Sequence, residues 1–105
     1  MTYRAEFTQT VRLAIVHLPP EVKREIKEGI RYLCRVPQGG EPLERELAGK
    51  WKLRVGRYRM IYEIEAHRRV LVILAVGHRR DLYEKLLKKS WLPISRFRYN
   101  DVTPR

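Results

Sequence analysis

The sequence predicts an α+β domain: a small twisted antiparallel sheet, made of one N-terminal strand plus three C-terminal strands, with a two-helix hairpin packed on one face and a short C-terminal helix. Three observations predict it. Strand-like alternation opens the chain, two helical stretches follow, and three further strand-like runs come after a segment rich in proline and glycine. With 105 residues, of which 44% are hydrophobic, the chain can build one modest core.

The first strand is predicted over residues 2–7. Its apolar residues Tyr3, Ala5 and Phe7 alternate with polar ones, and this period of two is typical of a strand that buries one face.

A helical hairpin is predicted between residues 8 and 36. The first helix is short and covers residues 8–17, and the second begins at the pair Pro19-Pro20, because proline is tolerated in the first turn of a helix. Gly29 weakens this second helix by about 1 kcal/mol relative to alanine, so we expect close packing on a neighbour there. The apolar stripe of the second helix consists of Val22, Ile26, Ile30 and Leu33.

Three strands are predicted after the segment PQGGEP and a linker that ends near Gly49. Residues 51–55 and 58–64 alternate, whereas residues 70–76 are apolar on both faces, which favours the middle of the sheet. Asp81 is a suitable N-cap for a last short helix. We predict one domain over residues 1–89 and a C-terminal extension of uncertain structure over residues 90–105.

The charge predicts anionic partners. Lysine and arginine number 23 against 12 acidic residues, a net charge of +11, and such a field attracts nucleic acid, an anionic membrane surface or an acidic protein. The longest apolar run is far shorter than the ~18 residues that span a bilayer, and the start has no signal-peptide core. Cys34 is the single cysteine and is expected to fill the core. These features predict a cytoplasmic protein and no membrane contact.

The stretch KWKLRVGRYRMIYEIE places like charges on neighbouring strands. If Gly56-Arg57 form a two-residue type II′ turn, Arg54 lies directly opposite Arg59. Such a pair destabilises a hairpin by up to about 1 kcal/mol, and no acidic residue lies between Lys50 and Arg59. One interpretation is a solvated surface that serves solubility. The other is a face that binds a phosphate backbone.

A second cluster follows the central strand. Gly77 allows a sharp bend, after which come His78, Arg79 and Arg80, with Tyr83 in the first turn of the predicted helix. An imidazole, two permanent cations and a phenol can together bind a phosphate, stabilise extra charge on it and move protons. Three structural interpretations stay open: a hydrogen-bonded histidine, a half-buried tyrosine, and an Arg80 that points to water.

No metal or cofactor is expected. Three scattered histidines and one cysteine lack the spacing of metal ligands, and the chain has neither a glycine-rich phosphate loop nor a serine-nucleophile motif. Any nucleophile must therefore come from the substrate, and RNA supplies one in its 2′-hydroxyl.

The runs LAGKWKLRVGRYRMIYEIE and VLVILAVGHRRDLYEKL, together with the helical hairpin, resemble the RelE/ParE superfamily of bacterial and archaeal toxins over roughly residues 2–88. For a RelE-like member, the resemblance implies a metal-independent mRNA interferase of a type II toxin–antitoxin system. Such an endoribonuclease enters the ribosomal A site and cuts the codon there by attack of a 2′-hydroxyl on the adjacent phosphate. A cognate antitoxin is the implied protein partner, in a toxin–antitoxin hetero-oligomer.

The resemblance also implies roles for single residues. Arg59 and Arg79 would stabilise the pentacoordinate phosphate, and Tyr83 would stack on or orient the base. His78 joins them as a candidate for proton transfer. The candidate RNA-binding residues are Lys50, Lys52, Arg54, Arg57 and Arg80. Two alternatives remain: a ParE-like toxin that inhibits DNA gyrase and cuts nothing, and a degenerate toxin that only binds RNA or its antitoxin.

Overall fold

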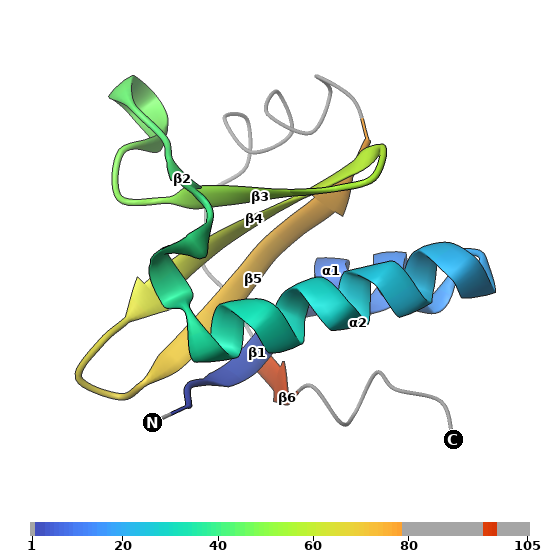
Figure 1. Cartoon of the computed structure of the whole chain (residues 1–105), viewed down its shortest axis with the longest axis horizontal. Helices are drawn as coiled ribbons and strands as arrows, with labels where there is room; N and C mark the ends of the chain where they lie inside the picture. Colours follow the sequence, from blue (N-terminus) through green and yellow to red (C-terminus); the bar gives the residue numbers. More distant parts are fainter. Residues whose placement is uncertain (1, 79–95, 99–105) are drawn as a thin grey trace.

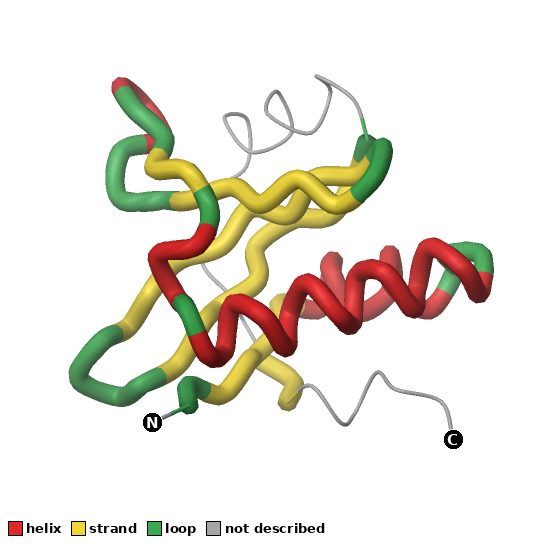
Figure 2. Tube along the Cα trace, viewed as in Figure 1, coloured by secondary structure: helices red, strands yellow, loops and turns green. Residues whose placement is uncertain are grey.

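The structure is a computed structural model that describes residues 2–78 and 96–98 (Figure 1). Its helices are α1 (Gln9–Val16) and α2 (Pro20–Arg35), followed by the short 3-10 turns η1 (Pro37–Gly39) and η2 (Arg45–Leu47). The strands are β1 (Arg4–Thr8), β2 (Glu41–Pro42), β3 (Trp51–Val55), β4 (Tyr58–Glu65), β5 (Val70–Gly77) and β6 (Arg96–Arg98). Within the described residues these strands form one sheet in the order β2-β3-β4-β5-β1-β6, with both helices on the same face (Figure 2). The predicted α+β class is confirmed.

The sheet is mixed rather than antiparallel. β3, β4 and β5 pair antiparallel as predicted, but β1 runs parallel to β5, with Arg4 opposite Val70. Tight turns force neighbouring strands to alternate in direction, whereas the two helices separate β1 from the other strands and leave its direction open. The prediction of an all-antiparallel sheet is therefore wrong at this strand pair.

Strands β2 and β6 were not predicted. β2 pairs with the first two residues of β3, and β6, from the C-terminal extension, pairs antiparallel with β1. The predicted short helix that begins at Asp81 lies outside the described residues. No helix in the described part of the chain is both long and apolar enough to cross a membrane.

The main core lies between the helices and the sheet. Its fully buried side chains include Phe7, Ile15, Ile26, Leu33, Met60, Tyr62, Leu71 and Ile73. The opposite face of the sheet carries a smaller cluster of Ile61, Val70, Val72 and Leu74, against which Leu43 and Leu47 pack. β5 contributes to both clusters, which confirms its predicted place in the middle of the sheet.

Local signals position the helical hairpin. The hydroxyl of Thr8 caps α1 by accepting a hydrogen bond of 3.3 Å from the Val11 amide, and α2 begins at the predicted proline pair. A Cβ atom on Gly29 would lie 3.0 Å from Val55 Cγ2 and 3.1 Å from Met60 Cε. The close packing expected at this glycine is confirmed, and it presses α2 against the β3–β4 hairpin.

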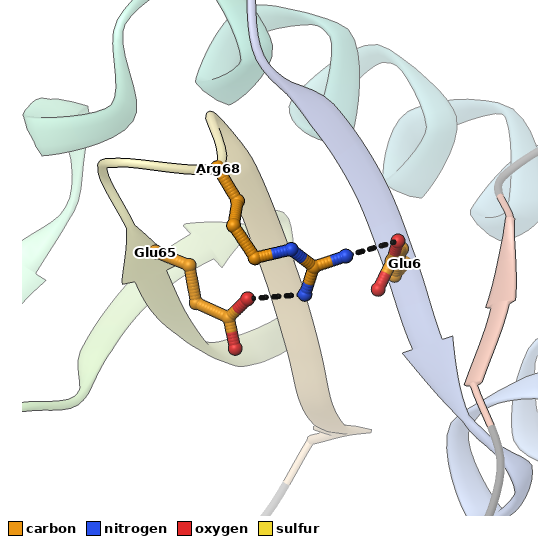
Figure 3. A network of polar contacts seen from close by, with 3 residues as sticks. All are labelled: Glu6, Glu65 and Arg68. Atoms are coloured by element: carbon orange, nitrogen blue, oxygen red, sulfur yellow. Dashed lines mark hydrogen bonds and ion pairs between the residues drawn. The ribbon is translucent and has the colours of Figure 1, made fainter.

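Arg68 joins three parts of the sheet on the face away from the helices (Figure 3). From the turn between β4 and β5, its guanidinium lies 2.8 Å from a Glu65 carboxylate oxygen and 3.7 Å from one of Glu6 on β1. The contacts connect β4 to β1 across β5, which lies between them.

Tyr62 fastens the segment that follows α2 to the sheet. Its hydroxyl donates a hydrogen bond of 2.7 Å to the Pro37 carbonyl and accepts one of 3.2 Å from the Gly40 amide. Burial of the phenol raises the pKa of Tyr62, although the Gly40 hydrogen bond opposes this shift. This contact holds η1 and β2 beside the start of β3.

The Tyr62→Phe variant is expected to lose about 1–2 kcal/mol of unfolding free energy, because two backbone groups lose a buried partner. Urea denaturation at neutral pH measures the loss. The raised pKa adds a pH dependence: above about pH 10 the unfolded tyrosine ionises before the folded one, so the wild type loses stability as pH rises. The difference in unfolding free energy between the wild type and Tyr62→Phe should therefore become smaller above about pH 10. A difference that does not change with pH would contradict a phenol that is buried in its neutral form.

Candidate nucleic-acid interface

The β3–β4 turn and the end of β5 lie at the same end of the sheet (Figure 1). Gly56 occupies the first turn position with φ of +59°, while Arg57 does not have a positive φ, as a type II′ turn requires. Arg54 lies opposite Arg59, as predicted, and Arg59 in turn lies opposite Gly77 of β5. The predicted hairpin register is confirmed.

Three arginines, which we call the hairpin cations, gather at this end: Arg54, Arg57 and Arg59. Arg54 and Arg57 are exposed and Arg59 is half-buried. Arg59 has a like charge on one side and a glycine, without a side chain, on the other. Within the part of the chain that the structure describes, no carboxylate forms an ion pair with any of the three. The hairpin cations thus present positive charge that no ion pair with a described residue offsets.

The two predicted lysines have acidic partners. Lys50 Nζ lies 3.4 Å from a Glu63 carboxylate oxygen, and Lys52 Nζ lies 3.9 Å from one of Glu41 on β2. The expectation that no acid offsets the charge of this stretch is therefore wrong for these lysines, because the carboxylates come from neighbouring strands. Free cations are concentrated at the turn rather than along the whole hairpin.

His78 lies on the other face of the sheet from Arg59. Its ring stacks on Tyr58, with centroids 5.1 Å apart and an interplanar angle of 24°, and Tyr58 packs on the helix-side core. A β-bulge causes this: β5 holds one extra residue, Leu74, between its pairs with β4, so the alternation of faces reverses beyond it. The structure thus brings His78 to the correct end of the sheet but separates it from the hairpin cations.

Arg79, Arg80 and Tyr83 lie outside the described residues, so their predicted roles stay predictions. In the described ranges, 2–78 and 96–98, no three histidine, cysteine or acidic side chains gather as metal ligands would. The chemistry available at the hairpin cations is binding of an anion by guanidinium groups, and the exposed imidazole of His78 lies on the other face of the sheet.

Sequence reasoning missed three residues around the site. Glu63 could have been found, because extending the predicted register by two pairs beyond Lys52 places it opposite Lys50. Glu41 could not, since β2 has two residues and no strand-like pattern. Tyr58 begins the alternating run predicted over residues 58–64, but its stacking on His78 depends on the bulge in β5.

Arg54→Thr is expected to stabilise the free protein by about 0.5–1 kcal/mol, because it removes a repulsion between directly opposed cations. Urea denaturation at low ionic strength measures the gain, which should shrink as salt screens the charges. The same variant should bind single-stranded RNA less tightly, with the log–log salt slope smaller in magnitude by about 0.7. A variant less stable than the wild type at low salt would contradict the repulsion.

Comparison with known proteins agrees with this geometry. The family model of the ParE toxin of type II toxin–antitoxin systems matches residues 3–83. Toxin RelG of Mycobacterium tuberculosis is 40% identical over 87 residues, a match that covers 81% of this chain and 100% of RelG.

Solved structures share the fold. The toxin–antitoxin complex RelBE2 of Mycobacterium tuberculosis matches with a TM-score of 0.70 at 40% identity, covering 75% of this chain and 100% of the matched chain. Free Escherichia coli RelE, in a variant form, matches with a TM-score of 0.68 at 20% identity, covering 84% of this chain and 97% of the matched chain. The archaeal RelE–RelB complex from Pyrococcus horikoshii matches with a TM-score of 0.63 at 28% identity, covering 76% of this chain and 98% of the matched chain. The chain therefore belongs to the RelE/ParE superfamily of toxins of type II toxin–antitoxin systems.

Proposed function

We propose that this toxin is a ribosome-dependent mRNA endonuclease that cuts the codon in the A site. The observation that carries the proposal is the half-buried Arg59, held between Arg54 and Gly77, with no carboxylate partner among the described residues. A cation that is fixed by a sheet and left without a counter-ion is preorganised for the charge of a phosphate.

The proposed reaction needs no nucleophile from the protein. The 2′-oxygen of a ribose forms a bond to the adjacent phosphorus, and the bond from phosphorus to the 5′-oxygen of the next nucleotide breaks. The proton of the 2′-hydroxyl leaves, and a proton is delivered to the departing 5′-oxygen. The products are a 2′,3′-cyclic phosphate and a free 5′-hydroxyl.

Each candidate residue has a part in this proposal. Arg59 stabilises the negative charge that develops on the pentacoordinate phosphate, and Arg54 holds a neighbouring phosphate. Arginine remains protonated at physiological pH, so neither acts as the base. We assign Arg79 a second contact to the phosphate and Tyr83 the orientation of the base. His78, on the opposite face of the sheet in the free protein, is the candidate for proton transfer.

The proposed partners follow from the charge and from the relatives. A net charge of +11 suits mRNA and ribosomal RNA in the A site. RelBE2 of Mycobacterium tuberculosis is a toxin–antitoxin complex, and we assign this chain a cognate antitoxin that neutralises the hairpin cations within a hetero-oligomer. Its place of action would be the cytoplasm, where ribosomes translate.

Primer extension on mRNA bound to programmed ribosomes tests the proposal. With wild-type protein, a new stop is expected within the A-site codon, and Arg79→Ala should remove it while ribosome binding is kept. An intact message at stoichiometric wild-type protein would overturn the proposal.

The match to the ParE family model favours one second candidate, inhibition of DNA gyrase without any cleavage. A supercoiling assay distinguishes it, because gyrase inhibition together with an intact message would establish the ParE-like activity.

A further inference from the structure

A second row of cations lies on α2, apart from the hairpin cations. Four basic residues recur at steps of four along this helix, and we call them the α2 ridge: Lys23, Lys27, Arg31 and Arg35. Residues four apart lie about 6 Å apart along the helix axis and about 40° apart around it, so the ridge is about 18 Å long and turns by about 120° from Lys23 to Arg35. None of the four forms an ion pair with any described residue.

The acidic residues of α2 lie on a different flank. Glu21, Glu25 and Glu28 are all exposed, and a Cβ on Gly56 would lie 3.5 Å from a Glu25 carboxylate oxygen. Glu25 therefore borders the β3–β4 turn, whereas Lys23, at the N-terminal end of the ridge, lies on the side of α2 that faces α1. The Lys23 ammonium donates a hydrogen bond of 3.4 Å to the Val16 carbonyl at the end of α1. The Glu25 carboxylate thus lies on the side of α2 nearer the hairpin cations.

We infer that the α2 ridge binds the phosphate backbone of base-paired RNA, as a second attachment site distinct from the hairpin. An evenly spaced row of cations that winds slowly around a helix can follow the phosphate backbone of a polyanion. Along the ridge, α2 carries a single exposed aromatic side chain, Tyr32, whose ring packs against Gly39, whereas single-strand binding surfaces stack successive bases on several aromatic rings. Paired RNA offers phosphates and hides its bases, so it suits a surface of this chemistry.

The choice of RNA as the polyanion rests on the proposed function. On the ribosome, a toxin that holds the message at the hairpin would gain residence time from a second contact to folded RNA, because the second contact forms at a high effective concentration. The alternative polyanion is a membrane surface. The apolar stripe of α2 is buried in the core, so the helix cannot insert it between lipids. The half-exposed Leu13 and Val16 of α1 lie near one end of the ridge, so the experiment includes vesicles.

Two matched double variants test the inference. Lys27→Gln/Arg31→Gln removes two ridge cations, and Glu25→Gln/Glu28→Gln makes the same kind of change on the acidic flank of the same helix. Glutamine keeps the helix propensity of all four positions. Fluorescence anisotropy over a series of salt concentrations measures binding to a blunt RNA duplex and to an unpaired strand of the same length.

The ridge variant should bind the duplex with a salt slope smaller in magnitude by about 2, one for each phosphate that the variant no longer neutralises, and should bind the unpaired strand nearly as the wild type does. The acidic-flank variant should bind the duplex at least as tightly as the wild type. An unchanged duplex slope in the ridge variant would overturn the inference. Loss of binding to phosphatidylserine vesicles with duplex binding intact would also overturn it, in favour of a membrane surface.

Failure of this inference and failure of the proposed function give different results. If the ridge variant binds the duplex normally and wild-type protein still cuts the A-site codon, only the inference fails. If wild-type protein leaves the message intact and the ridge variant still loses duplex binding, only the proposed cleavage fails.

Discussion

Arg59→Gln should lower the single-turnover rate of codon cleavage on programmed ribosomes by about 10²–10³-fold, the loss typical of removing one donor that stabilises a transition-state anion. Glutamine keeps hydrogen-bonding capacity but carries no charge. Arg59 is the hairpin cation that the sheet holds most firmly, because it is half-buried and pairs with strands on both sides. Its charge is therefore fixed in place before the substrate arrives.

Arg57→Gln is the matched control, since it removes the same charge from the exposed turn of the same hairpin. We expect Arg57→Gln to weaken RNA binding and to leave the rate at saturating ribosomes within about tenfold of the wild type, as loss of uniform binding does. The Arg59 variant should bind programmed ribosomes nearly as well as wild type. Equal losses of rate in both variants would show that the hairpin supplies only general electrostatic attraction.

The hairpin could be predicted from the sequence because its information is local. Gly56 at the first turn position selects a two-residue turn, the turn sets the register, and the register places Arg54 opposite Arg59. The helical hairpin was predictable for the same reason, since a proline pair and one apolar stripe define α2 without reference to the rest of the chain.

The features that were missed depend on partners distant in sequence. The parallel pairing of β1 with β5 follows from how two helices return the chain to the sheet, which no residue pattern records. The face on which His78 lies depends on the extra residue at Leu74 in β5. Simple alternation from Val70 would place His78 on the same face as Arg59, and the bulge reverses that outcome.

Contacts between residues distant in sequence also determine the charge of the site. The stretch from Lys50 to Arg59 contains no acidic residue, yet Glu41 and Glu63 approach its two lysines from other strands. Folding thus pairs both lysines at the β2 end with carboxylates and leaves the arginines near the turn without an ion pair to any described residue. The uncompensated arginines mark where stability is given up for function, as is common at active sites.

Gly40→Ala should lower the unfolding free energy by about 3 kcal/mol, an overpacking loss at the upper end of the usual range. Gly40 has φ of −90° and ψ of −160°, which alanine also adopts, so backbone strain is not the reason. A Cβ there would overlap the Lys52 backbone carbonyl and lie 2.7 Å from the Tyr62 hydroxyl. Neither can move freely, because one belongs to the sheet and the other is buried.

Gly49→Ala separates this overlap from the general effect of replacing a loop glycine. Gly49 has φ of +91°, and a Cβ added to it would meet no atom within 4 Å, so only conformational strain of about 1–2 kcal/mol is expected. Urea denaturation of both variants should therefore rank Gly40→Ala as the less stable. A smaller loss of unfolding free energy in Gly40→Ala than in Gly49→Ala would contradict this. It would show that the segment after α2 shifts away from β3 to accept the Cβ, so that the fold does not fix the contact of Glu41 with Lys52. Because β2 brings Glu41 to Lys52, a destabilised segment should also release that lysine and increase the salt dependence of RNA binding.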